Sequence, residues 1–262
     1  MRLSLKKPDY SAVITYANSS FASSAEQCQF NYDGSTSSSP FYQFFKDRNY
    51  FGASTSLHNK LVARTDPRDA VFFKPYATGG ELIFAPNGTP TQAQGIYGIS
   101  GLSIVKAPTF LLSYHEIEFL KAEAYARKND LVNAAAELKK AIVAACAKSN
   151  VNISSTVAGK YFDNIVAPRL TTQASAIKEI MVQKYIAFFE EESVEAYNDI
   201  RRLKAMGEGE SIQLSNPLNN TKFPLRFAYG SDDVTTNANI RKAYGDGSYV
   251  YTANVWWAGG SN

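Results

Sequence analysis

The residues with the clearest chemical potential form an acidic run, Glu190-Glu191-Glu192, with Glu195 close behind. A glycoside hydrolase needs two carboxyl groups across a cleft, about 5 Å apart or about 6.5–9.5 Å apart, to supply acid, base or nucleophile. A run of glutamates at a helix end is instead typical of a solvated face. We therefore interpret this run as exposed surface and predict no catalytic carboxylate pair.

The histidines and glycines point to no cofactor chemistry either. His58 and His115 are far apart in the sequence, and neither has a second ligand at metal-binding spacing. We expect His115 to be exposed in the first turn of a helix. A Ser-His-Asp arrangement stays open, but the sequence contains no Gly-x-Ser-x-Gly. Gly95, Gly98 and Gly101 recur every third residue, which predicts a bending loop or an irregular strand and not a dinucleotide site. We predict no catalytic residue, no metal and no cofactor.

Arginines could bind a phosphate or a carboxylate at two places. Arg201 and Arg202 are adjacent, and they lie about 100° apart around a helix. Asp199 and Glu195 are close in sequence, so we expect one of the two arginines to pair with Asp199 or with a core carbonyl. We interpret Arg226 in the same way, as a structural residue.

Aromatic residues are the unusual feature of the composition. The chain has 16 Tyr, 16 Phe and 2 Trp, against 2 His. Most of these rings are expected in the core, because aromatic side chains dominate buried area. Trp256 and Trp257 are adjacent, and we expect them to anchor the chain end in the core. The predicted ligand-binding residues lie in a loop-rich segment: Tyr42, Arg48, Asn49, Tyr50, Tyr76 and Tyr97.

Charge and composition exclude several classes of protein. With 27 basic and 24 acidic side chains the net charge is +3, too balanced for a nucleic-acid or membrane-surface binder. No apolar run approaches the roughly 20 residues that span a bilayer. The cysteines, Cys28 and Cys146, predict neither a disulfide framework nor a cysteine-based metal site. Cys146 is expected to be buried.

The elements that must position these residues suggest a mainly α protein that forms a single domain over 1–262. Residues 1–20 are expected to be helical. Residues 21–110 are dense in Ser, Thr, Gly, Asn and Pro with interleaved aromatics, so we predict a loop-rich excursion on the ligand side. Residues 111–206 are predicted to form a helical scaffold, and residues 207–262 to form loops.

Two helices of the scaffold are predicted to form a hairpin over 113–148. Ser113 and Glu116 match a capping box at a helix start. Small and large side chains then alternate in the pattern of a tetratricopeptide repeat, at Ala122, Tyr125, Ala134, Leu138 and Ala141. An ordinary helical hairpin is the alternative. We predict a tetratricopeptide-like scaffold with long loop-rich excursions and a few short strands.

Several motifs resemble the SusD/RagB superfamily, in its SusD-like branch. The helix 180–189 carries Gln183-Lys184-Tyr185, and the stretch 195–202 ends with Arg201-Arg202. Thr65-Asp66-Pro67-Arg68 is similar to the family's Asp-Pro-Arg. The stretch 223–229 followed by Asn237, and Val255-Trp256-Trp257, resemble its C-terminal region. The match covers essentially the whole chain but only the C-terminal portion of the family, so we expect a chain that begins within a domain.

The resemblance implies a surface lipoprotein of the bacterial outer membrane, of the Bacteroidetes type, that binds without cutting. Such proteins bind an oligosaccharide or another nutrient and deliver it to a SusC-like TonB-dependent transporter. The signal peptide and lipid anchor expected for the family are not present in 1–262. Sugars stack their C–H faces on aromatic rings, which is compatible with the composition. Two alternatives are a helical-repeat module that binds a protein or peptide and an enzyme acting on polysaccharide, which the absence of a paired acid/base signature disfavours.

Overall fold

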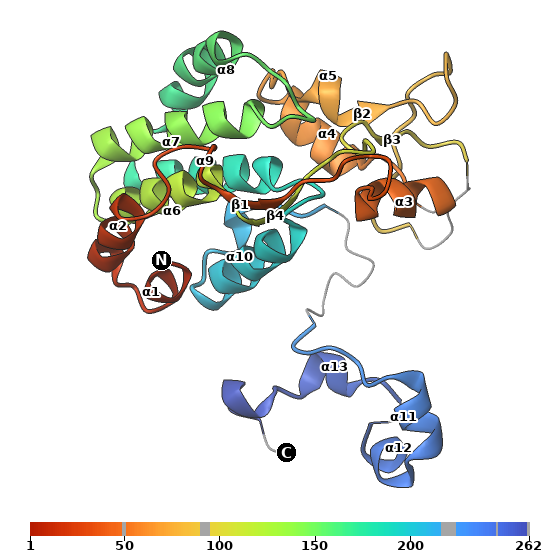
Figure 1. Ribbon diagram of the computed structural model, residues 1–262. Helices are drawn as coiled ribbons and strands as arrows, with labels where there is room; N and C mark the ends of the chain where they lie inside the picture. Colours follow the sequence, from red (N-terminus) through yellow and green to blue (C-terminus); the bar gives the residue numbers. More distant parts are fainter. Residues whose placement is uncertain (49–50, 90–94, 216–223, 245, 261–262) are drawn as a thin grey trace. The chain divides into compact units, whose positions relative to one another are not determined.

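A computed structural model of the chain describes residues 1–48, 51–89, 95–215, 224–244 and 246–260 (Figure 1). The chain divides into two compact units. Unit 1 comprises Met1–Asn87 and Thr91–Leu214, and unit 2 comprises Gly88–Pro90 and Ser215–Asn262. The sequence predicts one domain over 1–262, and this stays a prediction.

The centre of unit 1 is an antiparallel hairpin of two helices, α6 (Tyr114–Arg127) and α7 (Leu131–Cys146) (Figure 1). The hydroxyl of Ser113 accepts a hydrogen bond from the backbone N–H of Glu116, and Asp130 caps α7 in the same way. The left-handed φ of +61° at Asn129 makes the tight turn. The alanines and the leucine of the repeat pattern are fully buried between the helices: Ala122, Ala134, Leu138 and Ala141. The predicted tetratricopeptide-like scaffold is therefore confirmed.

Further helices cover this hairpin. The scaffold continues with α8 (Ser155–Tyr161), the π-helical η1 (Phe162–Val166), η2 (Ala167–Arg169), α9 (Gln173–Ala187), α10 (Ser193–Ala205) and η3 (Gly209–Ser211). Helix α9 is buried on most of its surface, and Ile180 and Met181 are fully enclosed in the main core. Cys146 is buried in that core as expected.

The N-terminal 20 residues, which the sequence predicts to be helical, form two helices. They are α1 (Arg2–Lys6) and α2 (Tyr10–Asn18), and α2 packs against α6. Pro8 separates them, because proline lacks the N–H that a continuous helix would need at that point. Asp9 then caps α2 by accepting from the N–H of Ala12.

The segment 21–110 is loop-rich, as predicted, with short elements between the loops. They are β1 (Cys28–Phe30), α3 (Pro40–Asp47), α4 (Thr55–Val62), α5 (Asp69–Phe72), β2 (Phe73–Lys74), β3 (Ile99–Ser100) and β4 (Thr109–Leu112). Strand β1 pairs antiparallel with β4, and β2 with β3. Leu57, Leu61 and Phe72 bury themselves against Val182 and Ile186 of α9. This second core fixes the excursion to the scaffold.

Two of the regularly spaced glycines lie where β2 and β3 pair. A Cβ at Gly101 would lie 2.1 Å from the carbonyl oxygen of Val71, and one at Gly98 would lie 2.3 Å from a methyl carbon of Leu82. The N–H of Gly101 donates to the carbonyl of Phe72. Close backbone approach therefore explains Gly101, and a close side chain accounts for Gly98. The short strand between them agrees with the irregular strand that the spacing predicts.

Within its described residues, unit 2 contains three short helices and a 3₁₀ turn where the sequence predicts loops. They are α11 (Ser231–Thr236), α12 (Ala238–Tyr244), α13 (Tyr249–Thr252) and η4 (Trp256–Ala258). Tyr229, Tyr244 and Tyr249 pack ring against ring, and the Arg226 guanidinium lies over all three. Trp256 is 68% exposed, so it is not buried among the described residues of unit 2, and its role as an anchor in the helical core stays a prediction. The side chain of Trp257 lies outside the described part of the chain.

Candidate functional site

The described members of the predicted binding set lie at several points of the excursion. Tyr42 is half-buried in α3, and Arg48 is exposed just after that helix, where its guanidinium donates to the carbonyl of Asp47. Tyr76 is 41% exposed on a loop. Two more predicted contacts, Asn49 and Tyr50, lie outside the described residues. The role of the predicted set in ligand binding therefore stays a prediction.

Two members of the predicted set do lie near glycines. The Tyr76 ring covers Gly95, where a Cβ would come 3.4 Å from its Cε1. Tyr97 packs its Cβ against Gly52, at 2.9 Å from the position of a glycine Cβ there. Gly52 belongs to the wall of an aromatic pocket in unit 1. Tyr97 thus lies directly behind one wall of that pocket.

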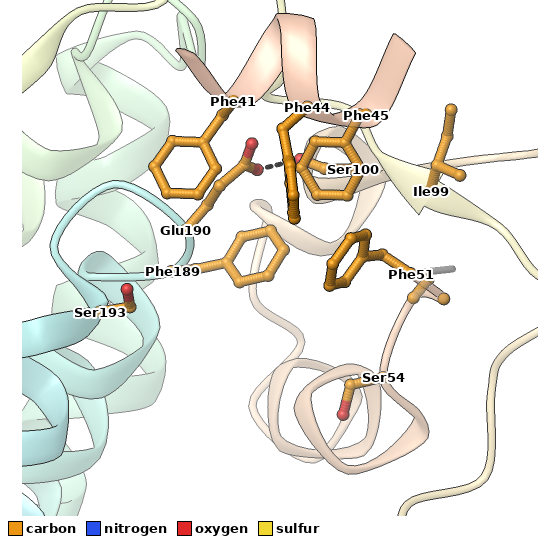
Figure 2. Close-up of a pocket in the computed structure, with 12 residues that line it drawn as sticks. Phe41, Phe44, Phe45, Phe51, Ser54, Ile99, Ser100, Phe189, Glu190 and Ser193 are labelled. Carbon is orange, nitrogen blue, oxygen red and sulfur yellow. Dashed lines mark hydrogen bonds between the residues drawn. The ribbon is translucent and has the colours of Figure 1, made fainter. Parts of the chain in front are cut away.

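This cavity, called here the phenylalanine pocket, has a volume of about 240 Å³ (Figure 2). Five phenylalanine rings dominate its lining, together with one isoleucine, three serines, a small-residue wall and a single carboxylic acid. The lining residues are Phe41, Phe44, Phe45, Phe51, Gly52, Ala53, Ser54, Ile99, Ser100, Phe189, Glu190 and Ser193. None of these phenylalanines is among the ligand contacts that the sequence predicts.

Helix α3 supplies three of the rings from one face. Pro40 occupies the first turn, where its missing N–H costs nothing. Phe41, Phe44 and Phe45 then follow at i, i+3 and i+4, the spacing of one helical face. No residue of this helix is fully buried, and Phe44 is 45% exposed. The face therefore points into the pocket and not into a closed core, and its periodicity was the sequence signal that could have identified it.

Phe51 and Phe189 complete the aromatic wall from other elements. The Phe51 ring lies 4.7 Å from that of Phe44 and 5.4 Å from that of Phe45, between centroids. Phe189 follows the end of α9 and stacks at 5.0 Å on the buried Phe72. In Figure 2 the rings of Phe51 and Phe189 point into the space below α3. One side of the pocket therefore belongs to the excursion and the other to the rigid scaffold.

Glu190 is the acid of the pocket. Its backbone takes a left-handed φ of +69°, which turns the chain sharply after α9. The Ser100 hydroxyl donates to its carboxyl group, and Figure 2 shows this group pointing toward α3. Burial is the largest influence and raises the pKa of Glu190 to about 7, with Glu191 adding to the rise; the Ser100 hydrogen bond, Lys148 and Lys74 oppose it.

The other two glutamates of the run face inward, which corrects the expectation of a solvated surface. Lys148 Nζ lies 2.9 Å from the Glu191 carboxylate, in an ion pair whose two side chains are almost completely buried. Glu192 accepts from the Ser113 hydroxyl at 2.7 Å and lies 2.5 Å from His115 Nε2. His115 is 1% exposed, so its predicted exposure is also wrong. These partners offset the desolvation penalty of burying the two carboxylates.

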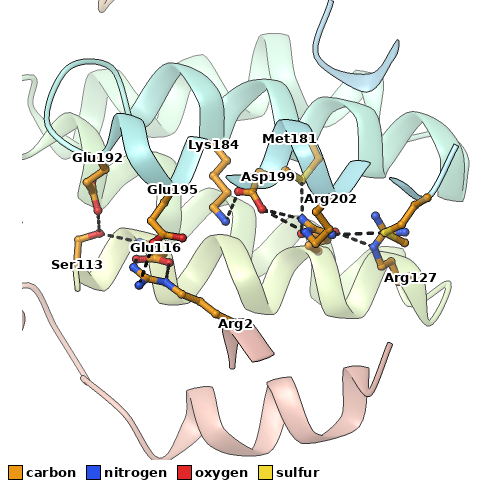
Figure 3. A network of polar contacts seen from close by, with 12 residues as sticks. Arg2, Ser113, Glu116, Arg127, Met181, Lys184, Glu192, Glu195, Asp199 and Arg202 are labelled. Atoms are coloured by element: carbon orange, nitrogen blue, oxygen red, sulfur yellow. Dashed lines mark hydrogen bonds and ion pairs between the residues drawn. The ribbon is translucent and has the colours of Figure 1, made fainter. Parts of the chain in front are cut away.

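Arg202 of the arginine pair is structural, as predicted for one of its two members (Figure 3). Arg202 donates to Asp199 at 2.9 Å and forms two bonds, at 2.7 and 2.8 Å, to the fully buried Glu123. Lys184 reaches Asp199 from α9 at 2.6 Å. Burial raises the pKa of Asp199, but Lys184 and Arg202 outweigh it, so the net shift is downward. The network joins three scaffold helices and leaves Arg202 unable to bind a ligand without breaking it.

The remaining candidates for chemistry also have structural partners. His58 Nδ1 lies 2.8 Å from Asp69, and its ring stacks on Phe84 at 3.8 Å. Within the residues that the structure describes, no group of three or more His, Cys, Asp or Glu side chains could hold a metal ion. Across the described helices, none is both long and apolar enough to cross a membrane. Among the lining residues of the phenylalanine pocket, Glu190 is the sole carboxylic acid, so the pocket lacks an acid/base pair.

Known proteins similar to this chain share its fold. The family model for SusD-like proteins, described as starch-binding and associating with the outer membrane, matches residues 1–230. A SusD/RagB family protein from Bacteroides thetaiotaomicron is 42% identical, with a TM-score of 0.82 over 97% of this chain and 60% of that chain. A SusD homologue from Bacteroides fragilis is 22% identical, with a TM-score of 0.66 over 90% of this chain and 58% of that chain.

A chitin-binding SusD homologue from Flavobacterium johnsoniae is 17% identical, with a TM-score of 0.62 over 90% of this chain and 55% of that chain. Among curated proteins, none is similar enough to count as a match. The chain thus spans between 55% and 60% of the length of these three solved relatives. The family match over residues 1–230 and the 42% identity over nearly the whole chain establish that it belongs to the SusD/RagB family, in its SusD-like branch.

Proposed function

We propose that this protein binds an oligosaccharide or a related nutrient at the outer surface of the bacterial outer membrane, without cutting it. Membership of a family described as starch-binding and associating with the outer membrane is the observation that carries this proposal. In the proposed arrangement the mature protein is held at the membrane by a lipid anchor, and its partner is a SusC-like TonB-dependent transporter that takes up the bound ligand.

The phenylalanine pocket supports a role in ligand binding. Phe44 and Phe51 expose 45% and 42% of their surface, although burying such rings is strongly favourable. A cluster of exposed rings around a hollow is typical of a binding site. Sugar rings present C–H faces that pack well on phenylalanine, and the Ser193 hydroxyl lines the pocket and can supply a polar contact. We propose this pocket as the ligand site, with Tyr97 behind its wall.

The test is a glycan panel measured with the purified protein by calorimetry. We expect at least one soluble oligosaccharide to bind, and Phe44→Ala and Phe51→Ala to weaken that binding about tenfold without lowering the melting temperature. Tyr76→Ala and Tyr97→Ala test the remaining proposed contacts in the same way. A variant that melts earlier but keeps its affinity per folded molecule would show that its ring belongs to the core.

The transporter role requires a separate experiment on the full-length parent protein. It is tagged in its native bacterium, the outer membrane is solubilised gently, and the recovered proteins are identified by mass spectrometry. A large β-barrel transporter at near-equal stoichiometry is the expected result. Recovery of soluble proteins in its place, with no glycan bound in the panel, would reject this proposal in favour of a helical-repeat module for proteins or peptides.

A further inference from the structure

We propose that the phenylalanine pocket recognises a sugar that carries a free, protonated amino group, with Glu190 as the counter-ion of that ammonium. This inference rests on the proposed glycan-binding function and specifies the class of ligand. It follows from three features of the pocket: a carboxyl group without a cationic partner among the described residues, aromatic rings around it, and a size suited to one sugar ring.

The first feature is the isolation of the Glu190 carboxyl group. Its neighbour Glu191 takes the nearby cation Lys148 in an ion pair of 2.9 Å. Within the described part of unit 1, Glu190 forms no ion pair and accepts from the Ser100 hydroxyl alone. Lys74, the other cation that influences Glu190, lies in the strand β2 and makes no ion pair with it. The pocket thus offers one acidic group and, among its lining residues, no basic one.

The second feature is the aromatic wall that surrounds this acid. The faces of aromatic rings attract cations, and the attraction grows when the cation is shielded from water. Phe41, Phe44 and Phe45 approach from α3, toward which the Glu190 carboxyl group points, and Phe189 is next to it in the chain (Figure 2). An ammonium group here would meet a carboxylate and ring faces together. A neutral hydroxyl would gain only a hydrogen bond.

The third feature is the size of the pocket. Its volume of about 240 Å³ lies just below the range of about 300–1,000 Å³ that is common for drug-sized ligands. One sugar ring therefore suits the pocket better than a folded chain of several. The apolar walls accept the C–H faces of that ring, and the Ser193 hydroxyl can bond one of its substituents.

The proposed ion pair between Glu190 and the ligand also makes ligand binding depend on pH. The isolated carboxyl group incurs a large desolvation penalty when ionised, which raises its pKa to about 7. A bound ammonium removes part of that penalty and so favours the ionised form. The charged groups of the protein that influence Glu190 are Glu191, Lys148 and Lys74. Because the ligand selects the carboxylate, its binding near neutral pH is expected to release a proton from Glu190.

The experiment compares two trisaccharides of equal length by isothermal titration calorimetry at about pH 7. One is the β-1,4 trimer of glucosamine, which carries amino groups, and the other is the same trimer fully N-acetylated. We expect the amino form to bind at least about tenfold more tightly, as a charge-assisted contact predicts. Glu190→Gln keeps the shape and the Ser100 contact, and it is expected to remove this preference. Glu81→Gln, at an exposed position outside the pocket, is the matched control and is expected to keep it.

The outcomes separate this inference from the proposed function. Equal affinity for the two trimers, or a preference that survives in Glu190→Gln, would overturn the amino-sugar inference while leaving glycan binding in place. Binding of other glycans but of neither trimer would also overturn it. A glycan panel in which nothing binds to wild-type protein would remove the proposed function itself. Near-UV circular dichroism of Glu190→Gln, expected to match wild type, verifies that lost preference reflects the lost charge.

Discussion

Replacing Glu190 by glutamine is expected to change how the stability of unit 1 depends on pH. The glutamate carboxyl group has an ordinary pKa of 4.5, and in the folded protein that of Glu190 rises to about 7 because burial disfavours its charge. Between these values the folded state holds a proton that the unfolded state has released. The free energy of unfolding therefore falls as the pH rises from 4.5 to about 7, and it stays at the lower level above that.

The size of the effect follows from the same values. One pKa unit corresponds to about 1.36 kcal/mol, so a rise from 4.5 to about 7 corresponds to about 3 kcal/mol. The side chain keeps some contact with water, which screens part of the penalty, so we expect about 2 to 3 kcal/mol. Glutamine carries no charge at any pH. The variant should therefore gain that amount over wild type between about pH 4.5 and pH 8.

The measurement is urea unfolding of both proteins at pH 4.5, 5.5, 6.5, 7.5 and 8, followed by far-UV circular dichroism. Only the difference between the two curves is interpreted. Glu118 also has a pKa raised to about 7, mainly by burial, but it is present in both proteins and its contribution cancels. Parallel curves, within about 0.5 kcal/mol at every pH, would refute the reasoning. A variant that loses stability at high pH would mean that the carboxylate is stabilised as an ion.

Two further predictions concern stability and are measured by urea unfolding at about pH 7. Arg68→Ala should lower the free energy of unfolding by about 3–5 kcal/mol, because it leaves the buried Asp66 carboxylate, 2.6 Å from the guanidinium, without its partner. The control Lys178→Ala, at an exposed site, should change this free energy by less than about 0.5 kcal/mol. Equal effects of the two substitutions would contradict a structural role for the Arg68–Asp66 ion pair. Gly101→Ala should destabilise by at least about 1–3 kcal/mol, since its Cβ would lie 2.1 Å from a backbone oxygen. Gly159→Ala lies in a helix, where the new Cβ would make only an ordinary contact with the Lys139 side chain, at 3.8 Å. It should stabilise by about 0.5–1 kcal/mol, and the same sign for both variants would contradict the packing described.

The scaffold could be predicted from local patterns because its helices obey simple rules. The capping serine at 113 and the small residues at Ala122, Ala134 and Ala141 each constrain a helix without reference to distant parts of the chain. Pro8 marks the break between the two N-terminal helices in the same local way, since proline interrupts a helix. The short helices of unit 2 were missed because turn-rich stretches with isolated aromatics do not distinguish a loop from a helix of one or two turns.

The phenylalanine pocket could be predicted only in part. The spacing of Phe41, Phe44 and Phe45 shows one apolar helix face, but a helix face says nothing about what it meets. Phe189 and Glu190 come from a point much later in the chain, and only the packing of α4 and α5 on α9 brings the two segments together. The sequence-based prediction chose tyrosines because their hydroxyl groups can bond polar ligands. It therefore did not include the phenylalanines that line the pocket.

The three consecutive glutamates show why position in the fold, and not composition, decides what an acidic side chain does. Glu191 and Glu192 are bound by Lys148, Asn150, Ser113 and His115, so both are part of the structure that holds the turn after α9. These bonds fix the backbone on the C-terminal side of Glu190, where a positive φ would otherwise cost energy. With the turn held in this way, the Glu190 carboxyl group is kept against aromatic rings that would not retain it alone. The neighbouring carboxylates therefore supply the rigidity, and Glu190 supplies the charge that a cationic ligand would meet.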